Sequence, residues 1–416
     1  MANIRTFKAL RPDDLLADKV AALPYDVYNR AEAREEALKQ PLSFLNIDRP
    51  ETQFEEGHDM YAPEVYEKAK EMLLEQIDRG IYKQDEKACY YIYELTMDQR
   101  AQTGIVAVAA VNDYVSGVIK KHENTRADKE QDRINHVDTL SAQTGPIFLA
   151  YRKNDVISAV VSKIKATTPV VSFVSSDGIG HRVWIISDDS DISAVNNAFS
   201  GISEIYIADG HHRAASAVKV GLKRRQQEQE EKGSYDPDAE YNFFLSVLFP
   251  ENELMILPYN RVVKDLNGMT EDEFVDRISG KFEVESVGIT PVTPVKKGQF
   301  GMFLGDKWYS LKARPEILDD SDPVKSLDVS VLQDNVLKPM LGIDDPKTDK
   351  RIDFVGGIRG LEELERRVHT DMKVAFSMYP TSIGELFDVA SAGLLMPPKS
   401  TWFEPKLRSG LFIHRF

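Results

Sequence analysis

The run from Tyr206 to Ala215 combines an acid, a glycine and three basic residues in an order that suits phosphate binding. The apolar residues at its start predict a strand, and the glycine predicts a turn. The alanine-rich end predicts the beginning of a helix. The first turn of a helix has unpartnered backbone N–H groups and the positive end of the helix dipole, which favour an anion. Arg213 adds a planar fork of donors, and Asp209 could cap the helix or hold a divalent ion or an alcohol beside the phosphate. The run therefore predicts a phosphate-handling site.

Two other interpretations of this run remain open. Asp209-Gly210 is also an ordinary turn sequence, so the passage could be purely structural. His211 and His212 could suggest a metal, but adjacent helical residues point about 100° apart, whereas metal-binding pairs usually stand three or four residues apart. The chain also lacks the other ligands expected of such a site. We predict no protein-held metal centre here.

A second set of candidates follows a short apolar, strand-like piece. Glu123 is flanked by His122, Thr125 and Arg126, which could orient a carboxylate or contact an anion. The charged residues 128–133 beyond them are expected to form a solvated face.

A third candidate lies near the end of the chain. Lys399, Ser400 and Thr401 offer donors for an anion, as does Lys406, and two aromatic residues between them offer flat faces. Such a combination suits a nucleotide. The alternative is a rigid C-terminal segment that its prolines stiffen and its aromatic side chains pack.

Composition narrows the class of protein. With 416 residues, of which 42% are hydrophobic, the chain is expected to form two domains with substantial cores. The single cysteine, Cys89, lies in an apolar stretch and is expected to be a core residue rather than a nucleophile. A net charge of −15 opposes nonspecific binding to nucleic acid or to an anionic membrane. No apolar run approaches a membrane span and no signal peptide is recognisable, so we expect a cytoplasmic protein.

The remaining pattern predicts helices and strands in both halves of the chain. Expected helices are 31–39, 65–79, 189–199, 213–231, 270–278, 329–340, 361–368 and 383–393. Expected strands are 88–95, 103–111, 146–151, 183–186, 242–249, 253–258, 300–304 and 308–311. Three pairs of these strands are expected as hairpins, namely the two around residue 99, the two around residue 251 and the two around residue 306. A break at 232–238 suggests an N-terminal region 1–232, which contains the phosphate site, and a C-terminal α+β region 241–416 that could act as a lid, a substrate domain or an interface. The alternative is that the break is a loop within one domain.

Several of these motifs together resemble a known superfamily. The Asp209–Arg213 run, the His122-Glu123 pair and the unit that joins them look like the ParB/sulfiredoxin superfamily, specifically its free serine kinase (SerK) branch. Five separated pieces in order resemble a large uncharacterised bacterial and archaeal family related to that branch. They are 24–27, 117–123, 207–213, 327–330 and 396–405. The resemblance implies an α+β fold with a ParB/sulfiredoxin-like core and additional N-terminal and C-terminal regions.

The resemblance also implies roles for individual residues. Glu123 matches the acid that acts as base on the hydroxyl of free serine, and Asp209 matches the acid of the nucleotide-binding motif. Gly210, His211, His212 and Arg213 match the rest of the motif used for nucleotide phosphates and substrate. ATP or ADP is then the nucleotide and Mg²⁺ the expected ion. The chain departs from the pattern at Lys121, where a proline is expected before the His-Glu pair.

We therefore expect a nucleotide-dependent phosphotransferase acting on a small hydroxy amino acid, in the simplest case serine or phosphoserine, in either direction. The alternative is a nucleotide-binding regulatory protein of the partition kind, with little or no phosphoryl transfer. A sulfiredoxin-like repair reaction is less favoured because Cys89 lies far from the phosphate motif in sequence. No nucleic-acid or membrane partner is expected, and a homodimer is possible.

Overall fold

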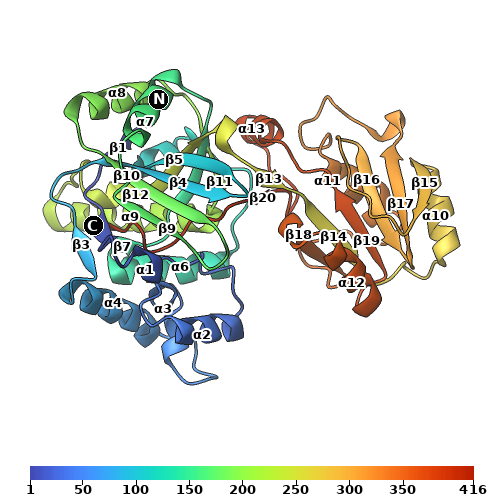
Figure 1. Cartoon of the computed structure of the whole chain (residues 1–416), viewed down its shortest axis with the longest axis horizontal. Helices are drawn as coiled ribbons and strands as arrows, with labels where there is room; N and C mark the ends of the chain where they lie inside the picture. Colours follow the sequence, from blue (N-terminus) through green and yellow to red (C-terminus); the bar gives the residue numbers. More distant parts are fainter. The chain divides into compact units, whose positions relative to one another are not determined.

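The computed structural model describes residues 1–416 and divides into two compact units (Figure 1). Unit 1 comprises Met1–Leu254 and Pro405–Phe416, and unit 2 comprises Met255–Glu404. Unit 2 is thus an insertion in the chain of unit 1. Its ends are paired in a short antiparallel ladder of β13 (Ile256–Leu257) and β20 (Trp402–Phe403), which explains how the chain leaves and returns at one place.

The main sheet of unit 1 is mixed and mostly antiparallel. The path of its neighbouring strands is β6-β11-β8-β12-β5-β4-β10-β9, and β1 also pairs with β5. Their bounds are β1 Ile4–Arg5, β4 Tyr90–Met97, β5 Arg100–Ala110, β6 Ile119–Lys120, β8 Ile147–Tyr151, β9 Val171–Val174, β10 Gly180–Ile186, β11 Ile205–Asp209 and β12 Phe243–Pro250. Only the pairs β6·β11 and β8·β12 are parallel. This mixture of helices and largely antiparallel strands agrees with the predicted α+β class.

The predicted hairpin around residue 99 is confirmed. Strands β4 and β5 pair in register up to Met97 and Arg100, with Asp98 and Gln99 at the tip. Both tip residues have positive φ, 48° and 64°. Two consecutive left-handed residues are the geometry of the tight turn that matches strand twist.

One face of this sheet carries an extensive hydrophobic core. Helices α5 (Val111–Val115), α7 (Asp155–Lys165), α8 (Asp189–Ser200) and α9 (His211–Lys232) pack their apolar residues against β4, β5, β8 and β12. On the other face, Phe412 from the end of the chain contacts the rings of Tyr91 and Tyr93. The last residues of the chain are therefore part of unit 1's core.

A second core of unit 1 is built by the first third of the chain. It holds α1 (Ala17–Val20), α2 (Arg30–Lys39), α3 (Leu45–Asp48), α4 (Pro63–Asp78) and the pair β2 (Leu10–Pro12) and β3 (Tyr82–Gln84). It also includes Ile413, which bridges to Leu10, while β21 (His414–Arg415) pairs with β7 (Ala142–Gln143). The predicted helices 31–39 and 65–79 are confirmed as α2 and α4.

The prediction of a solvated face for residues 128–133 holds for Asp128 and Gln131, which are exposed, but is wrong for Glu130, Asp132 and Arg133. These residues belong to α6 (Ala127–Leu140), which packs against α4 and α9. Glu130, Asp132 and Arg133 are buried because each is paired: Glu130 with Lys219, and Arg133 with its neighbour Asp132 at 2.9 Å. Charge density alone does not reveal such partners in a sequence.

Unit 2 has a six-stranded sheet with the order β15-β17-β16-β19-β14-β18. The strands are β14 Tyr259–Val263, β15 Phe282–Gly288, β16 Gln299–Leu304, β17 Lys307–Ala313, β18 Ile352–Gly356 and β19 Val374–Met378. The helices are α10 Glu271–Ser279, α11 Asp328–Leu332, α12 Glu362–Thr370 and α13 Ile383–Ser391. The hairpin of β16 and β17 is as predicted, and Thr270 caps α10 with a capping box.

The predicted hairpin of 242–249 with 253–258 is wrong. Strand β12 pairs with β5 and β8 in unit 1, whereas β13 pairs with β20 in unit 2. The chain passes from one unit to the other between Leu254 and Met255. Residues 233–240, where the sequence breaks, connect α9 to η2 (Glu240–Asn242) within unit 1.

Asp328 gives unit 2 a distinctive pH dependence. Its buried carboxylate accepts the N–H of Gly298 with both oxygens, at 2.9 and 3.0 Å. Burial raises the pKa of Asp328 to about 7, against the opposing effect of that N–H. Between about pH 4 and about pH 7, the Asp328 carboxyl therefore keeps its proton in the folded state but has lost it in the unfolded chain. The neutral carboxyl group of Asp328 makes its full contribution to the free energy of unfolding at low pH. That contribution is lost as pH rises from about 4 through about 7, and each unit by which the pKa is raised corresponds to about 1.4 kcal/mol.

We expect Asp328→Asn to flatten this dependence, because asparagine stays neutral and can still accept from Gly298. The measurement is thermal unfolding of the full chain between about pH 5 and about pH 8, with the exposed Asp334→Asn as control. Identical pH profiles for Asp328→Asn and the unsubstituted protein would contradict the assignment.

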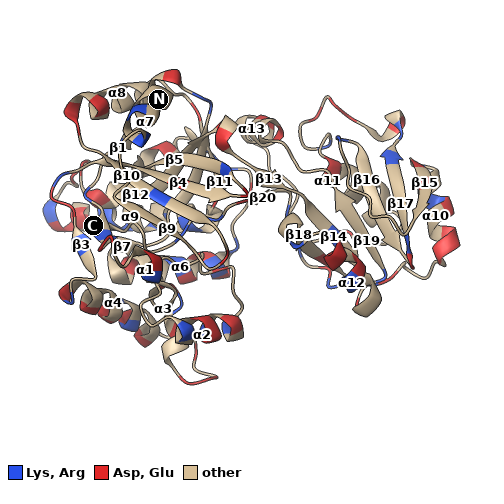
Figure 2. Cartoon of the chain, viewed as in Figure 1, with Lys and Arg blue, Asp and Glu red and all other residues tan.

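Charged residues of both signs are interspersed on the helices. Figure 2 shows acidic and basic positions side by side along α2 and α4, so neither helix presents a basic stripe of the kind that binds nucleic acid. None of the helices combines the length and the apolar character that crossing a membrane requires.

Candidate functional site

The predicted strand, turn and helix are present at the Asp209 motif. Strand β11 ends at Asp209, Gly210 turns with φ 93° and ψ 33°, and α9 begins at His211. Only glycine adopts this left-handed conformation readily. No side chain caps α9, and its first backbone bond is donated by Ala214 to the Gly210 carbonyl. The N-terminal N–H groups of this long helix are thus available to an anion.

Asp209 lies between two cations. Its Oδ2 is 3.3 Å from Lys406 Nζ and 3.7 Å from Arg213 Nη2, while its Oδ1 accepts the N–H of Gly210 at 2.8 Å. Burial would raise the pKa of Asp209, but Lys406 and Arg213 outweigh it and hold the pKa well below its usual range. Asp209 is therefore ionised throughout the physiological range and holds both cations at the helix N-terminus.

Arg213 folds back over the turn that precedes its own helix. Its Nη1 donates to the Pro146 carbonyl at 2.6 Å, and its Nε and Nη2 lie against Gly210, where a Cβ would approach them to 3.0 Å. Neither Nε nor Nη2 makes a hydrogen bond. A fixed guanidinium with uncommitted donors beside a helix N-terminus is well suited to phosphate oxygens.

The two histidines of the motif hold the 122–126 loop against α9. His211 Nε2 accepts the backbone N–H of His122 at 3.4 Å, and His212 Nε2 accepts that of Arg126 at 2.9 Å. Each ring therefore carries its proton on Nδ1 when neutral. The histidine side chains thus join the two predicted sets of residues, which are far apart in sequence.

Glu123 is placed by this arrangement beside the helix N-terminus. Its Oε2 is 3.9 Å from His211 Nδ1, and its side chain is 37% exposed. Burial lowers the pKa of His211 to about 4, although Asp209 opposes the shift. His211 is therefore neutral at pH 7, so the group that faces Glu123 there is an N–H and not an imidazolium cation.

His122 packs edge-on against His211, with ring centroids 4.4 Å apart. The residue is 1% exposed, and neither of its ring nitrogens makes a well-formed hydrogen bond. Burial first, and His211 second, lower the pKa of His122 to about 3. His122 is a neutral wall of the site in this structure.

Thr125 and Arg126 are committed to other partners. The Thr125 hydroxyl donates to Glu130 at 2.5 Å, and the exposed Arg126 side chain pairs with Asp128 at 2.8 Å. Both contacts help to hold the loop that carries Glu123, and the Arg126 side chain is 71% exposed.

Lys399, Ser400 and Thr401 belong to unit 2. Lys399 Nζ lies over the Tyr259 ring at 5.5 Å, and the buried Ser400 donates its hydroxyl to the Pro397 carbonyl at 2.7 Å. The Ser400 carbonyl in turn accepts from Thr381 at 2.9 Å. Within unit 2 these contacts fit the packed, rigid segment that the sequence left open as an alternative.

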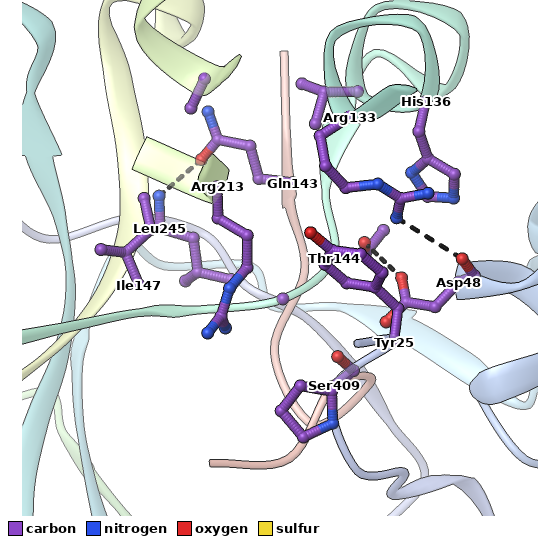
Figure 3. Close-up of a pocket in the computed structure, with 14 residues that line it drawn as sticks. Tyr25, Asp48, Arg133, His136, Gln143, Thr144, Ile147, Arg213, Leu245 and Ser409 are labelled. Atoms are coloured by element: carbon purple, nitrogen blue, oxygen red, sulfur yellow. Dashed lines mark hydrogen bonds between the residues drawn. The ribbon is translucent and has the colours of Figure 1, made fainter. Parts of the chain in front are cut away.

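A small pocket of about 30 Å³ adjoins Arg213, room for about two water molecules (Figure 3). Figure 3 shows Arg213, Tyr25 and Ser409 around it. Tyr25 lies under the Arg133 guanidinium at 4.1 Å, and Thr144 donates to the buried Asp48 at 2.9 Å. Burial raises the pKa of Tyr25 to about 12, so its hydroxyl remains a donor.

Sequence reasoning missed much of this site. Lys406 was grouped with Lys399 as an anion donor, but its contact with Asp209 was not foreseen. Arg133 was assigned to a solvated face and Ser409 was not noticed. One signal was available in the sequence. Residues 24–27 and 396–405 resemble pieces of the same family, and Tyr25 lies in the first piece and Lys406 just beyond the second.

The acidic side chains near the start of α9 can supply only some of the ligands that a magnesium ion needs. No three His, Cys, Asp or Glu side chains are arranged to hold a metal. Mg²⁺ is usually bound by one or two carboxylates together with substrate phosphates. Asp209 fits that pattern as the single carboxylate, with a nucleotide supplying the remaining ligands.

The arrangement is that of a mixed α+β protein with a candidate site at an anion-favouring helix N-terminus faced by a carboxylate. The chain belongs to the family described as protein of unknown function (DUF1015), which matches residues 4–330. Among curated proteins, no sequence matches the chain.

Three solved structures illustrate the likenesses found. A free serine kinase in complex with AMP is 15% identical, with a TM-score of 0.32, covering 72% of this chain and 86% of that one. SbnI with a C-terminal truncation from Staphylococcus aureus is 11% identical, with a TM-score of 0.37 and coverage of 72% and 82%. A conserved hypothetical protein from Pyrococcus furiosus is 15% identical, with a TM-score of 0.30 and coverage of 73% and 93%. Likeness at this level bears on neither activity nor substrate.

Proposed function

We propose that the protein transfers a phosphoryl group between a nucleotide, ATP or ADP, and a small hydroxy amino acid, most simply serine. The observation that carries the proposal is the gathering of Glu123, Asp209, Lys406 and Arg213 at the uncapped N-terminus of α9. Phosphoryl transfer needs positioning and charge neutralisation more than covalent chemistry. The motif resemblance supplies the serine part of the proposal.

In the forward direction, the acceptor hydroxyl oxygen attacks the terminal phosphorus of the nucleotide. The bond from that phosphorus to the bridging oxygen breaks, and the shortened nucleotide leaves with the electron pair. Glu123 accepts the hydroxyl proton, which a serine hydroxyl would otherwise hold tightly. Arg213, Lys406 and the N–H groups of α9 neutralise the phosphate oxygens, and Mg²⁺ bound with Asp209 would add positive charge there.

Phosphorus NMR of the purified full chain with Mg²⁺ tests the proposal. The mixtures are serine with ATP, serine with ADP, and phosphoserine with ADP, beside a panel of other hydroxy compounds. A growing or shrinking phosphoserine signal supports the proposal and gives its direction. Bound nucleotide without transfer to any acceptor would refute it and favour a regulatory nucleotide-binding protein.

A further inference from the structure

A second and larger cavity lies at the other end of β8 from the Asp209 site. Its volume is about 400 Å³, within the usual range for small-molecule pockets. Asp209 pairs with Phe148 near the start of β8, whereas Tyr151, the last residue of the strand, lines the cavity. Three strand residues span about 10 Å. The cavity is therefore separate from the phosphate site.

This cavity lies where the parallel pair of β8 and β12 ends. Tyr151 closes β8 and Pro250 closes β12, and α7 forms the opposite wall. Ligands of open α/β sheets commonly bind beyond the carboxyl ends of parallel strands. The location alone thus favours a ligand, and the lining decides its chemistry.

Two charged side chains line the cavity: Glu253, which has no basic partner, and Lys165. Glu253 Oε2 accepts the N–H of Thr103 at 3.2 Å, and its Oε1 has no partner. Lys165, 30% exposed, is held at 2.5 Å from the buried Glu94 and donates to the Thr103 hydroxyl at 2.8 Å. Lys165 therefore retains a third donor, fixed in place by two contacts. Opposite charges on one cavity favour a zwitterion over a simple cation or anion.

Tyr151 adds a polar group that the protein leaves unsatisfied. Its side chain is 2% exposed, yet its hydroxyl makes no hydrogen bond. Burial, and then the charge of Glu253, raise the pKa of this hydroxyl, so it stays protonated. The hydroxyl oxygen is not sealed from solvent, so it opens to the cavity, where water or a polar group of a ligand can reach it.

The rest of the lining is apolar. Ile105 and Pro250 come from the sheet, and Ile157, Val161 and Ala166 come from α7 and the residue that follows it. These side chains could bury an aliphatic group of a ligand. A nucleotide is disfavoured because its several phosphate charges would face the Glu253 carboxylate, with Lys165 as the one cation of the lining.

We propose that this cavity binds an α-amino acid with an aliphatic side chain as its zwitterion. The ligand ammonium meets Glu253, its carboxylate meets Lys165 and the Tyr151 hydroxyl, and its side chain packs against α7. This site is independent of the proposed phosphoryl transfer, because its residues lie outside the Asp209 site.

Titration calorimetry on the full chain tests the proposal with L-leucine, L-valine and L-methionine. Two analogues of leucine, 3-methylbutylamine and N-acetyl-L-leucine, each lack one of the two charges. We expect at least one amino acid to bind saturably and, with leucine as probe, each analogue to bind at least about tenfold more weakly. No binding of any of the three amino acids up to about 10 mM would overturn the proposal, as would equal binding of the analogues.

Variants locate the binding. Glu253→Gln should weaken it about tenfold or more, since glutamine keeps the contact with Thr103 but loses the charge. Tyr151→Phe should weaken it less, and Val161→Phe should fill the cavity and prevent binding. Thermal unfolding checks that each variant is folded. Arg213→Ala should leave amino-acid binding unchanged, and its loss there would place the ligand at the Asp209 site and refute the assignment.

Discussion

Glu123→Gln is expected to lower phosphoryl transfer by about 100- to 10,000-fold while leaving nucleotide affinity nearly unchanged. The substitution keeps the shape of the side chain but removes its ability to take a proton. Nucleotide binding should persist because the donors of α9, Arg213 and Lys406 remain. The measurement combines the rate of phosphoserine formation with the dissociation constant of the nucleotide.

The matched control is Glu56→Gln, which makes the same change at an exposed position. It should transfer phosphate at the unsubstituted rate. Wild-type turnover in Glu123→Gln would remove Glu123 from its role as base. Equal loss of transfer and of nucleotide affinity would instead make Glu123 part of the nucleotide site.

Arg213→Ala is expected to weaken nucleotide binding by about 10- to 100-fold, the worth of a charge-assisted hydrogen bond or two. The Nε and Nη2 groups beside Gly210 are the reason, because they make no hydrogen bond within the protein and present a planar fork of donors at this helix N-terminus. Arg213→Lys should recover only part of the affinity, since it restores the charge without the fork.

Arg213 also holds the Pro146 carbonyl, so thermal unfolding must accompany the binding measurement. The control Arg79→Ala removes an exposed arginine on α4 and should change neither affinity nor transfer. An unchanged dissociation constant in a folded Arg213→Ala protein would contradict the phosphate role.

Local signals predicted much of the secondary structure. Thr270 is followed three residues later by Glu273, and the structure has the capping box that this spacing indicates. Glycine after an apolar strand likewise predicted the turn at Gly210 and the helix that follows. Such features depend on neighbouring residues, which a sequence displays directly.

Long-range pairing could not be predicted in the same way. Strand β13 pairs with β20, nearly the whole of unit 2 away, and nothing near Ile256 indicates that partner. Arg133 looked solvated because its partners Asp48 and Tyr25 come from distant segments. Lys406 reaches Asp209 only because the chain returns from unit 2 to unit 1. The sequence therefore predicted the site residues at the start of α9, but not the residues from distant segments that surround them.

The most direct test is a crystal structure of the full chain with ADP and Mg²⁺. We predict that the phosphate oxygens lie within hydrogen-bond distance of the first N–H groups of α9 and of the Arg213 guanidinium, with Lys406 beside them. Phosphates bound instead by Lys399, Ser400 and Thr401, away from α9, would contradict the account.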